Sequence, residues 1–276
     1  MNAVSRGLAF LAAQQNEAGF WEDWDLPVGP SRMWTTAYVG WRLASSGYSL
    51  KSAANWIEAA ELDGGGWGYA ESTGADADST ALGILFLTTV GRRAPESALR
   101  RLLHFVRDDG GFGTYAFDQS FGAWTNSQVE VTATVAMALR AAGVDDEAVR
   151  RAESYVRSRR RPDGIWNSYW WTSPFYATEV CVRLLGDDGA ALGQLRPANA
   201  FEEALQAMTL KKSAGKMAAT QLADGSWQSA PVLRLTKRDV FAPWLSDDAG
   251  PCFPDPRRVF TTATVVASLS VAHQRA

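Results

Sequence analysis

The sequence is poor in the residues that build metal centres and disulfide frameworks. Its 276 residues include only 2 cysteines and 2 histidines, too few for a disulfide framework or a thiolate zinc site. No stretch approaches the ~20 consecutive apolar residues that span a bilayer, although peripheral membrane contact stays open. Basic residues number 27 against 30 acidic ones, and this balance argues against a nucleic-acid partner. We therefore expect a globular cytoplasmic protein without a bound metal.

Tryptophan and glycine are instead placed in a recurring pattern. The 12 tryptophans are accompanied by short glycine–aromatic segments, each of which follows a helix-like stretch. Glycine takes the left-handed conformation that ends a helix, and the aromatic side chain after it can fold back onto the helices. Five such segments indicate an internal repeat: residues 15–21, 63–69, 108–115, 161–166 and 221–227.

A second, more apolar type of helix follows these turns. Aligned alanines near the helix starts, Ala37, Ala81, Ala133 and Ala177, are separated by 44, 52 and 44 residues. The next step, to Ala263, is 86 residues, about twice as long. One repeat therefore has a degenerate inner helix, which we place between residues 198 and 216.

The two helix types predict a closed double ring. A period of ~40–47 residues is typical of two-helix repeats. Residues 98–107 have one polar face, which suits an outer helix, whereas residues 131–139 and 261–269 have almost none and should be buried all round. We therefore expect an all-α protein whose residues 1–276 form one (α/α)6 toroid of about twelve helices, with the apolar helices inside.

The repeats and one acidic hexapeptide resemble a known family. Residues 7–21 resemble the QW repeat of squalene–hopene and oxidosqualene cyclases. Residues 76–81 look like the D-x-D-D-T-A motif of class II terpene cyclases. Protein prenyltransferase β-subunits have the same toroid. The resemblance implies an enzyme that cyclises or isomerises an isoprenoid or similar polyene after protonating it.

The resemblance also implies roles for particular residues. Asp78 would be the proton donor, with Asp76 beside it. An alkene is a weak base, so the acid must be kept neutral by a nearby carboxylate and a dry cavity. Aromatic faces would stabilise the developing cation. Candidates for this lining are Trp34, Trp41, Phe86, Phe175, Tyr176 and Phe260.

Two features depart from the family pattern. Ser79 occupies the third acidic position of the motif, which removes one carboxylate from the cluster. The family's cyclases also pair two toroids, whereas this chain has length for one. The substrate would therefore bind in the chain's own central cavity, or the chain would associate with a second toroid or form a homodimer.

The repeat register suggests a carboxylate pair independently of the family. Asp78 and Glu130 fall at the same register as Trp34, Pro174 and Phe260, so both acids would project into one cavity mouth. Ionising both carboxylates of such a pair is unfavourable, so one of them would stay protonated and act as the acid. The alternative is structural, because acidic residues cap the first turn of helices, and this explains Asp76 without catalysis.

Other charged residues have simpler interpretations. Glu179 is expected to pair with Arg183 one turn later. Residues 228–258 contain five prolines, show no helix period, and would cross one rim of the ring. Their basic side chains could bind a diphosphate, although ordinary rim charges explain them equally well: Lys237, Arg238, Arg257 and Arg258. No cofactor is expected, except Mg²⁺ if the substrate is a diphosphate.

Two other function classes stay open at this point. The toroid could be a non-catalytic subunit that holds a hydrophobic ligand or docks a second toroid. It could also be a carbohydrate-active (α/α)6 enzyme that uses a carboxylate pair. The apolar inner helices argue against glycans, which need many hydrogen-bonding groups.

Overall fold

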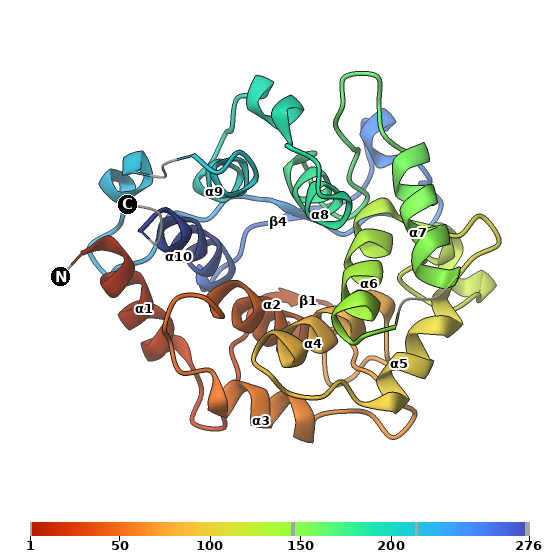
Figure 1. The fold of residues 1–276 in the computed structure, drawn as a ribbon, viewed down its shortest axis with the longest axis horizontal. Helices are drawn as coiled ribbons and strands as arrows, with labels where there is room; N and C mark the ends of the chain where they lie inside the picture. Colours follow the sequence, from red (N-terminus) through yellow and green to blue (C-terminus); the bar gives the residue numbers. More distant parts are fainter. Residues whose placement is uncertain (1, 145–146, 213–214, 274–276) are drawn as a thin grey trace.

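Six helices form a closed inner ring (Figure 1). The computed structural model describes residues 2–144, 147–212 and 215–273. Each inner helix packs against its two inner neighbours, and the last closes the ring against the first. The inner helices are α2 (Met33–Leu43), α4 (Ala77–Thr89), α6 (Val129–Ala141), α8 (Phe175–Leu185), α9 (Ala200–Thr209) and α10 (Val259–His273). Helix α9 lies where the degenerate inner helix was predicted, and that prediction is confirmed.

The outer ring is less regular than predicted. Four of its positions hold α-helices, and the 3-10 turn η1 (Leu103–Phe105) continues the third. These helices are α1 (Ala3–Gln14), α3 (Lys51–Ala59), α5 (Glu96–Leu102) and α7 (Glu147–Ser158). The other two positions hold only the 3-10 turns η3 (Ala190–Gln194) and η4 (Gly215–Thr220), both packed on α9. Residues 186–199, between α8 and α9, leave too little chain for a second full helix.

The glycine–aromatic turns join each outer element to the next inner helix. In four of them the tryptophan indole donates a hydrogen bond of 2.7–2.9 Å to the carbonyl ten residues earlier. These are Trp21, Trp67, Trp166 and Trp227. The backbone N–H of each of these tryptophans, and of Phe112 in the fifth turn, donates to a threonine hydroxyl in the first turns of the next inner helix. Each turn therefore satisfies polar groups at the end of one helix and fixes the start of the next.

These threonine bonds define the true register of the repeats. In the fourth repeat the threonine is Thr178, bonded to Trp166. The alignment on Ala177 was therefore wrong by two residues, and the residue at the register of the predicted acid is Tyr176 instead of Pro174. In the correct register, Glu179 occupies the position that holds alanine in the other repeats. An alignment based on alanine therefore gave the wrong register here. The charge of Glu179 is buried in an ion pair.

That ion pair links α2 to α8 inside the ring. Arg42 on α2 donates two hydrogen bonds, of 3.0 and 2.9 Å, to the two carboxylate oxygens of Glu179 on α8. The predicted pair with Arg183 is also present, at 2.7 Å. Burial alone would raise the pKa of Glu179, but the two guanidiniums lower it to about 2.

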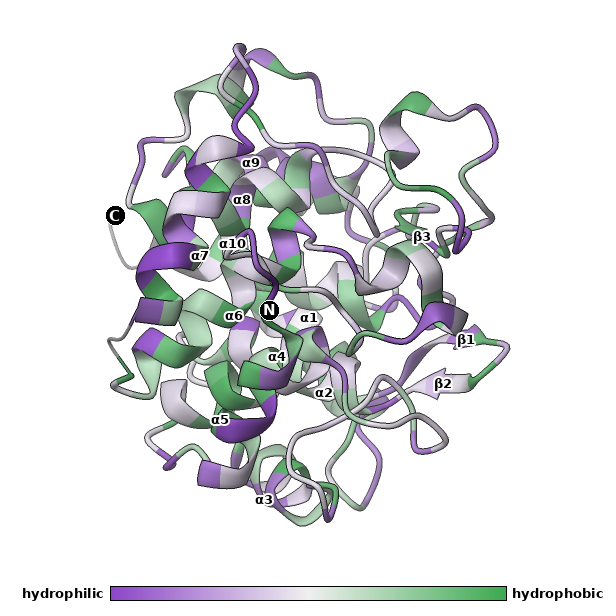
Figure 2. Ribbon diagram, turned by 90° about the vertical axis from the view of Figure 1, so that its right-hand side faces the viewer, coloured by the Kyte–Doolittle hydropathy of each residue, from purple (hydrophilic) through white to green (hydrophobic). Residues whose placement is uncertain are grey.

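The loops gather at one end of the helical rings (Figure 2). Strands β1 (Asp23–Leu26) and β2 (Gly29–Ser31) form a hairpin ahead of α2, and the 3-10 segment η2 (Gln119–Thr125) precedes α6. Residues 228–258 contain the antiparallel pair β3 (Leu233–Arg234) and β4 (Cys252–Phe253), with η5 (Pro243–Leu245) between them. Within the described ranges, no helix is both long and apolar enough to cross a membrane.

Candidate active site

A cavity of about 760 Å³ opens at the loop end of the ring, a size typical of ligand sites. The starts of α2 and α4, the β1–β2 hairpin, residues 114–124, residues 170–171 and the β3 segment contribute to its walls. Aromatic side chains form a large part of the lining: Trp24, Trp34, Tyr69, Tyr115, Phe117, Phe121, Trp124, Trp170 and Trp171. The site is therefore an apolar pocket with a small number of charged groups.

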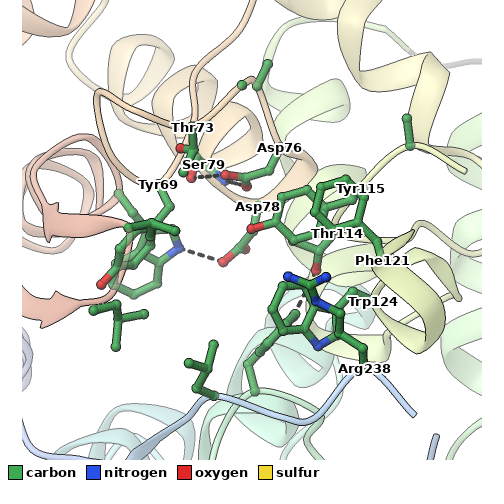
Figure 3. Close-up of a pocket in the computed structure, with 18 of the residues that line it drawn as sticks. Tyr69, Thr73, Asp76, Asp78, Ser79, Thr114, Tyr115, Phe121, Trp124 and Arg238 are labelled. Carbon is green, nitrogen blue, oxygen red and sulfur yellow. Dashed lines mark hydrogen bonds between the residues drawn. The ribbon is translucent and has the colours of Figure 1, made fainter. Parts of the chain in front are cut away.

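Asp78, in the first turn of α4, extends into this cavity (Figure 3). Its Oδ2 accepts a 2.5 Å hydrogen bond from the indole nitrogen of Trp34, and its Oδ1 has no hydrogen-bond partner among the described residues. Burial, together with the charges of Asp76 and Glu130, raises the pKa of Asp78 to about 7, although the indole bond acts in the opposite direction. A carboxylic acid that keeps a substantial protonated fraction at neutral pH therefore faces an aromatic cavity.

Asp76 has the capping role that its position suggested. Its Oδ1 accepts a 2.7 Å bond from the backbone N–H of Ser79, and its Oδ2 accepts a 2.8 Å bond from the Ser79 hydroxyl. The pKa of Asp76 is raised to about 6, because the effect of burial exceeds the lowering by both Ser79 bonds. The serine that departs from the motif thus supports the ionised form of Asp76, and the resulting charge helps to keep Asp78 protonated.

Glu130 does not reach the cavity, so the predicted pair with Asp78 at one mouth was wrong. Its Oε1 accepts hydrogen bonds from the hydroxyl of Ser168 at 3.0 Å and from the N–H groups of Tyr169 and Trp170 at 2.6 and 2.9 Å. Glu130 starts α6 at the predicted register, but its side chain turns to these donors. Buried backbone N–H groups require an acceptor, and Glu130 supplies it.

Of the six predicted aromatic lining residues, only Trp34 lies on the cavity wall. Phe260 lies behind that wall, with its ring centroid 5.7 Å from Trp34 and 5.2 Å from Trp171. Tyr176 packs 4.5 Å from Trp171 in the same layer. These two residues therefore support the lining instead of contacting a ligand.

The other three predicted aromatics lie elsewhere in the ring. Trp41 packs under the guanidiniums of Arg42 and Arg183, at 4.3 and 5.3 Å from the ring centroid. Phe86 is fully buried and Phe175 nearly so; neither contributes to the cavity wall. Lining residues that sequence reasoning missed are Trp24 in β1, Trp124 in η2 and Trp171 in the loop before α8, segments that show no helical period. The tryptophan pair at residues 170–171 was the one available signal.

Three of the four predicted diphosphate contacts are engaged outside the cavity. Lys237 pairs with Asp248. Arg257 pairs with Glu22 and Asp25, both at 3.2 Å, and Arg258 pairs with Asp224 at 2.7 Å. These are the ordinary rim charges of the alternative interpretation.

Arg238 alone of the four lines the cavity, with its guanidinium 5.0 Å from the Trp124 ring centroid. As for metals, no cluster of three histidine, cysteine or acidic side chains suited to holding an ion is found within residues 2–144, 147–212 and 215–273.

Two curated proteins are similar to parts of this chain. No protein-family model matches the sequence. Drimenyl diphosphate synthase from Streptomyces showdoensis is 31% identical over 172 residues, 60% of this chain and 30% of that protein. Squalene–hopene cyclase from Alicyclobacillus acidocaldarius is 29% identical over 133 residues, 40% of this chain and 21% of its own length. The chain thus matches less than a third of each of these two curated relatives.

A solved structure matches over the whole chain. The type II terpene cyclase MstE from Scytonema superposes with a TM-score of 0.87 at 23% identity, covering 99% of this chain and 98% of that one. The chain therefore has the fold of a type II terpene cyclase, as the resemblance of its repeats implied. The one-toroid extent of the chain is shared with MstE.

Proposed function

We propose that this protein is an enzyme that protonates a carbon–carbon double bond of an isoprenoid and thereby starts a cyclisation or isomerisation. The observation that carries the proposal is Asp78, an acid with a pKa near 7 that extends into a cavity lined mainly by aromatic rings. The relatives support it, since a variant of MstE was solved with geranylgeranyl dihydroxybenzoate as its substrate.

The hydrogen bonds indicate which oxygen carries the proton. Because the indole N–H of Trp34 occupies Oδ2 of Asp78, the acidic proton resides on the unpartnered Oδ1. Transfer of this proton to one alkene carbon leaves a cation on the other carbon and a carboxylate on Asp78. The indole bond stabilises that carboxylate, so the same contact helps the donor after it has lost its proton.

The cavity then controls the cation. The faces of Trp34, Trp24 and Trp171 form one aromatic cluster, with ring centroids 5.7–6.0 Å apart. Such faces attract a cation and offer no strong nucleophile that would capture it early. A second double bond of the same chain attacks the cation to close a ring. The final cation loses a proton to water, which gives a neutral product, and the Asp78 carboxylate takes up a proton from solvent for the next turnover.

The rival functions are less well supported by the site. A passive hydrophobic-ligand subunit gives no reason for a neutral carboxylic acid in the cavity. A glycan-cleaving enzyme needs a second functional carboxylate beside Asp78. Of the two other aspartates that line the cavity, Asp76 has both oxygens bonded to Ser79, and Asp118 is exposed and accepts the backbone N–H of Ser120.

The test replaces the proposed donor. Asp78→Asn keeps the size of the side chain but has no acidic proton, so turnover of geranyl to geranylgeranyl substrates and squalene should fall by about 10²–10⁴-fold or more. The matched control is Asp63→Asn, an exposed aspartate in the turn before the same helix. Products would be analysed by mass spectrometry, with thermal unfolding to verify folding. Full activity of Asp78→Asn would refute the mechanism.

A further inference from the structure

The second residues of the six inner helices occupy equivalent places in the repeat. Five of them stand two residues before the threonine that bonds to a glycine–aromatic turn, and the second residue of α9 corresponds to them. Four of the six are aromatic. The set is Trp34, Asp78, Glu130, Tyr176, Phe201 and Phe260.

Phe260 is the centre of the aromatic part of this set. It is fully buried, and its ring centroid lies 4.6 Å from those of Trp24 and Phe201. It also stacks on Trp171 at 5.2 Å with an interplanar angle of 13°. Trp171 packs in turn on Tyr176 and Phe201, at 4.5 and 5.7 Å. Trp171 faces the cavity, and the rings behind it form a continuous aromatic layer that separates the cavity from the interior of the helical ring.

Beyond this layer the interior becomes polar. Tyr38, one turn further along α2 than Trp34, packs 4.5 Å from Phe260, and its hydroxyl is hydrogen-bonded to Thr264. The guanidinium of Arg42, in its buried pair with Glu179, lies 5.0 Å from the Tyr38 ring. An apolar chain that passed the layer would disturb these bonded polar groups, which is costly in a buried site. The aromatic layer is therefore the last apolar position along the axis of the ring.

The proposed acid lies at the same depth as this layer. Asp78 shares the register of Tyr176 and Phe260 but extends into the cavity, where it accepts the hydrogen bond from Trp34. The Trp34 ring lies 5.8 Å from Trp171. The end of a bound chain that reaches the aromatic layer therefore lies near the acid, and the position of the layer determines which part of the chain meets it.

We infer that Tyr176, Phe201 and Phe260 form the floor of the site and set the longest isoprenoid chain that it can bury. The inference rests on the proposed function for the class of chain, but it concerns chain length, which the acid does not determine. These three residues lie behind the wall and act through Trp171, so they are positioning residues.

Truncating a floor residue should lengthen the site. Removal of the Phe260 ring leaves an apolar void into which Trp171 or the end of the chain can move, and apolar voids take up apolar groups. A phenyl ring is about the size of one isoprene unit. A chain one unit too long for the unmodified floor should therefore fit in Phe260→Ala.

The experiment measures binding without turnover, so its result is independent of the acid mechanism. In the Asp78→Asn background, quenching of tryptophan fluorescence gives the Kd of geraniol, farnesol, geranylgeraniol and geranylfarnesol. Each isoprene unit that is buried should tighten binding about tenfold or more, and the gain should stop at the chain that fills the site. In Phe260→Ala the first chain beyond this limit should bind about tenfold or more tightly than before. Shorter chains should change little, because the Phe260 ring lies behind the wall.

Phe86→Ala is the matched control. Phe86 is also fully buried on an inner helix, but its ring lies against Gly40 of α2 and does not contribute to the cavity wall. Phe201→Ala and the milder Phe260→Leu keep the test valid if Phe260→Ala fails to fold, which thermal unfolding would reveal. Affinity that tightens through the whole series with the unmodified floor would overturn the inference. So would a limit that stays at the same chain length in the folded floor variants, or one that Phe86→Ala moves equally.

Discussion

The indole nitrogen of Trp34 and the Oδ2 atom of Asp78 are 2.5 Å apart, although the two residues are 44 positions apart in the sequence. Both stand at the same register of adjacent inner helices, two residues before the threonines that bind the glycine–aromatic turns. The repeat therefore places a donor on one helix beside an acid on the next. Burial and neighbouring charges favour the protonated acid, and the indole favours the carboxylate that protonation of a substrate leaves behind.

Replacing Trp34 with Phe should raise the pKa of Asp78. The acid is active when protonated, so in the wild type activity should be present below pH ~7 and fall about tenfold per pH unit above it. Loss of an indole bond that stabilises the carboxylate moves this falling limb to higher pH, by up to about one unit. The maximal rate should also fall, because the bond to the product carboxylate is gone. A pH–rate profile checks this prediction. If activity falls over the same pH range in the variant as in the wild type, the hydrogen bond from Trp34 does not act on the pKa of Asp78.

Asp76→Asn should move the falling limb of the pH–rate profile to lower pH. The amide oxygen still accepts the backbone N–H of Ser79, so the helix cap is kept. The negative charge that raises the pKa of Asp78 disappears, and the acid therefore ionises at lower pH. At pH 7 the rate should fall, with recovery at more acidic pH. A rate that stays low at every pH would mean that Asp76 takes part in the chemistry directly.

Glu130→Gln should remain active within about tenfold, in contrast to Asp78→Asn. The side-chain oxygen of glutamine can keep the bonds to Ser168, Tyr169 and Trp170. Glu130→Ala leaves those donors unpaired and should lower the free energy of unfolding by roughly 1–3 kcal/mol. Turnover assays and urea denaturation separate the two effects. Complete loss of turnover in the folded glutamine variant would restore Glu130 as a catalytic candidate.

Breaking the buried ion pair should weaken the ring itself. Glu179→Gln leaves the Arg42 charge without its carboxylate, which should cost about 3–5 kcal/mol of unfolding free energy. Arg183→Gln is the control, since Arg183 is 46% exposed and its removal should cost no more than about 1 kcal/mol.

The Arg42–Glu179 ion pair should also make the free energy of unfolding depend on pH. The pKa of Glu179 is about 2 in the folded chain against an ordinary 4.5, so its stabilisation is present above pH ~4.5 and is lost as the pH falls toward 2. Glu179→Gln should therefore lose less stability than the wild type over this acidic range. Identical acid profiles in urea denaturation would show that the pair contributes little.

The sequence alone determined the architecture, because the signals that build it are local and repeated. Each glycine–aromatic turn contains both the residue that ends a helix and the indole that bonds back to it, so Trp21, Trp67 and their counterparts were recognisable without coordinates. The apolar character of the inner helices then required a closed ring. Asp78 was also identifiable, because its motif and its place at a helix start are both local features.

Only the tertiary structure decided which side chains share the cavity. Glu130 occupies the predicted register yet turns toward the N–H groups of Tyr169 and Trp170, a choice made by donors 39 and 40 residues away. Glu179 stands where the other repeats have alanine, which is why the fourth repeat was aligned wrongly. A charged residue is tolerated at this position because Arg42, 137 residues away, pairs with it. Side-chain orientation depends on partners that the fold brings together, and no local pattern records them.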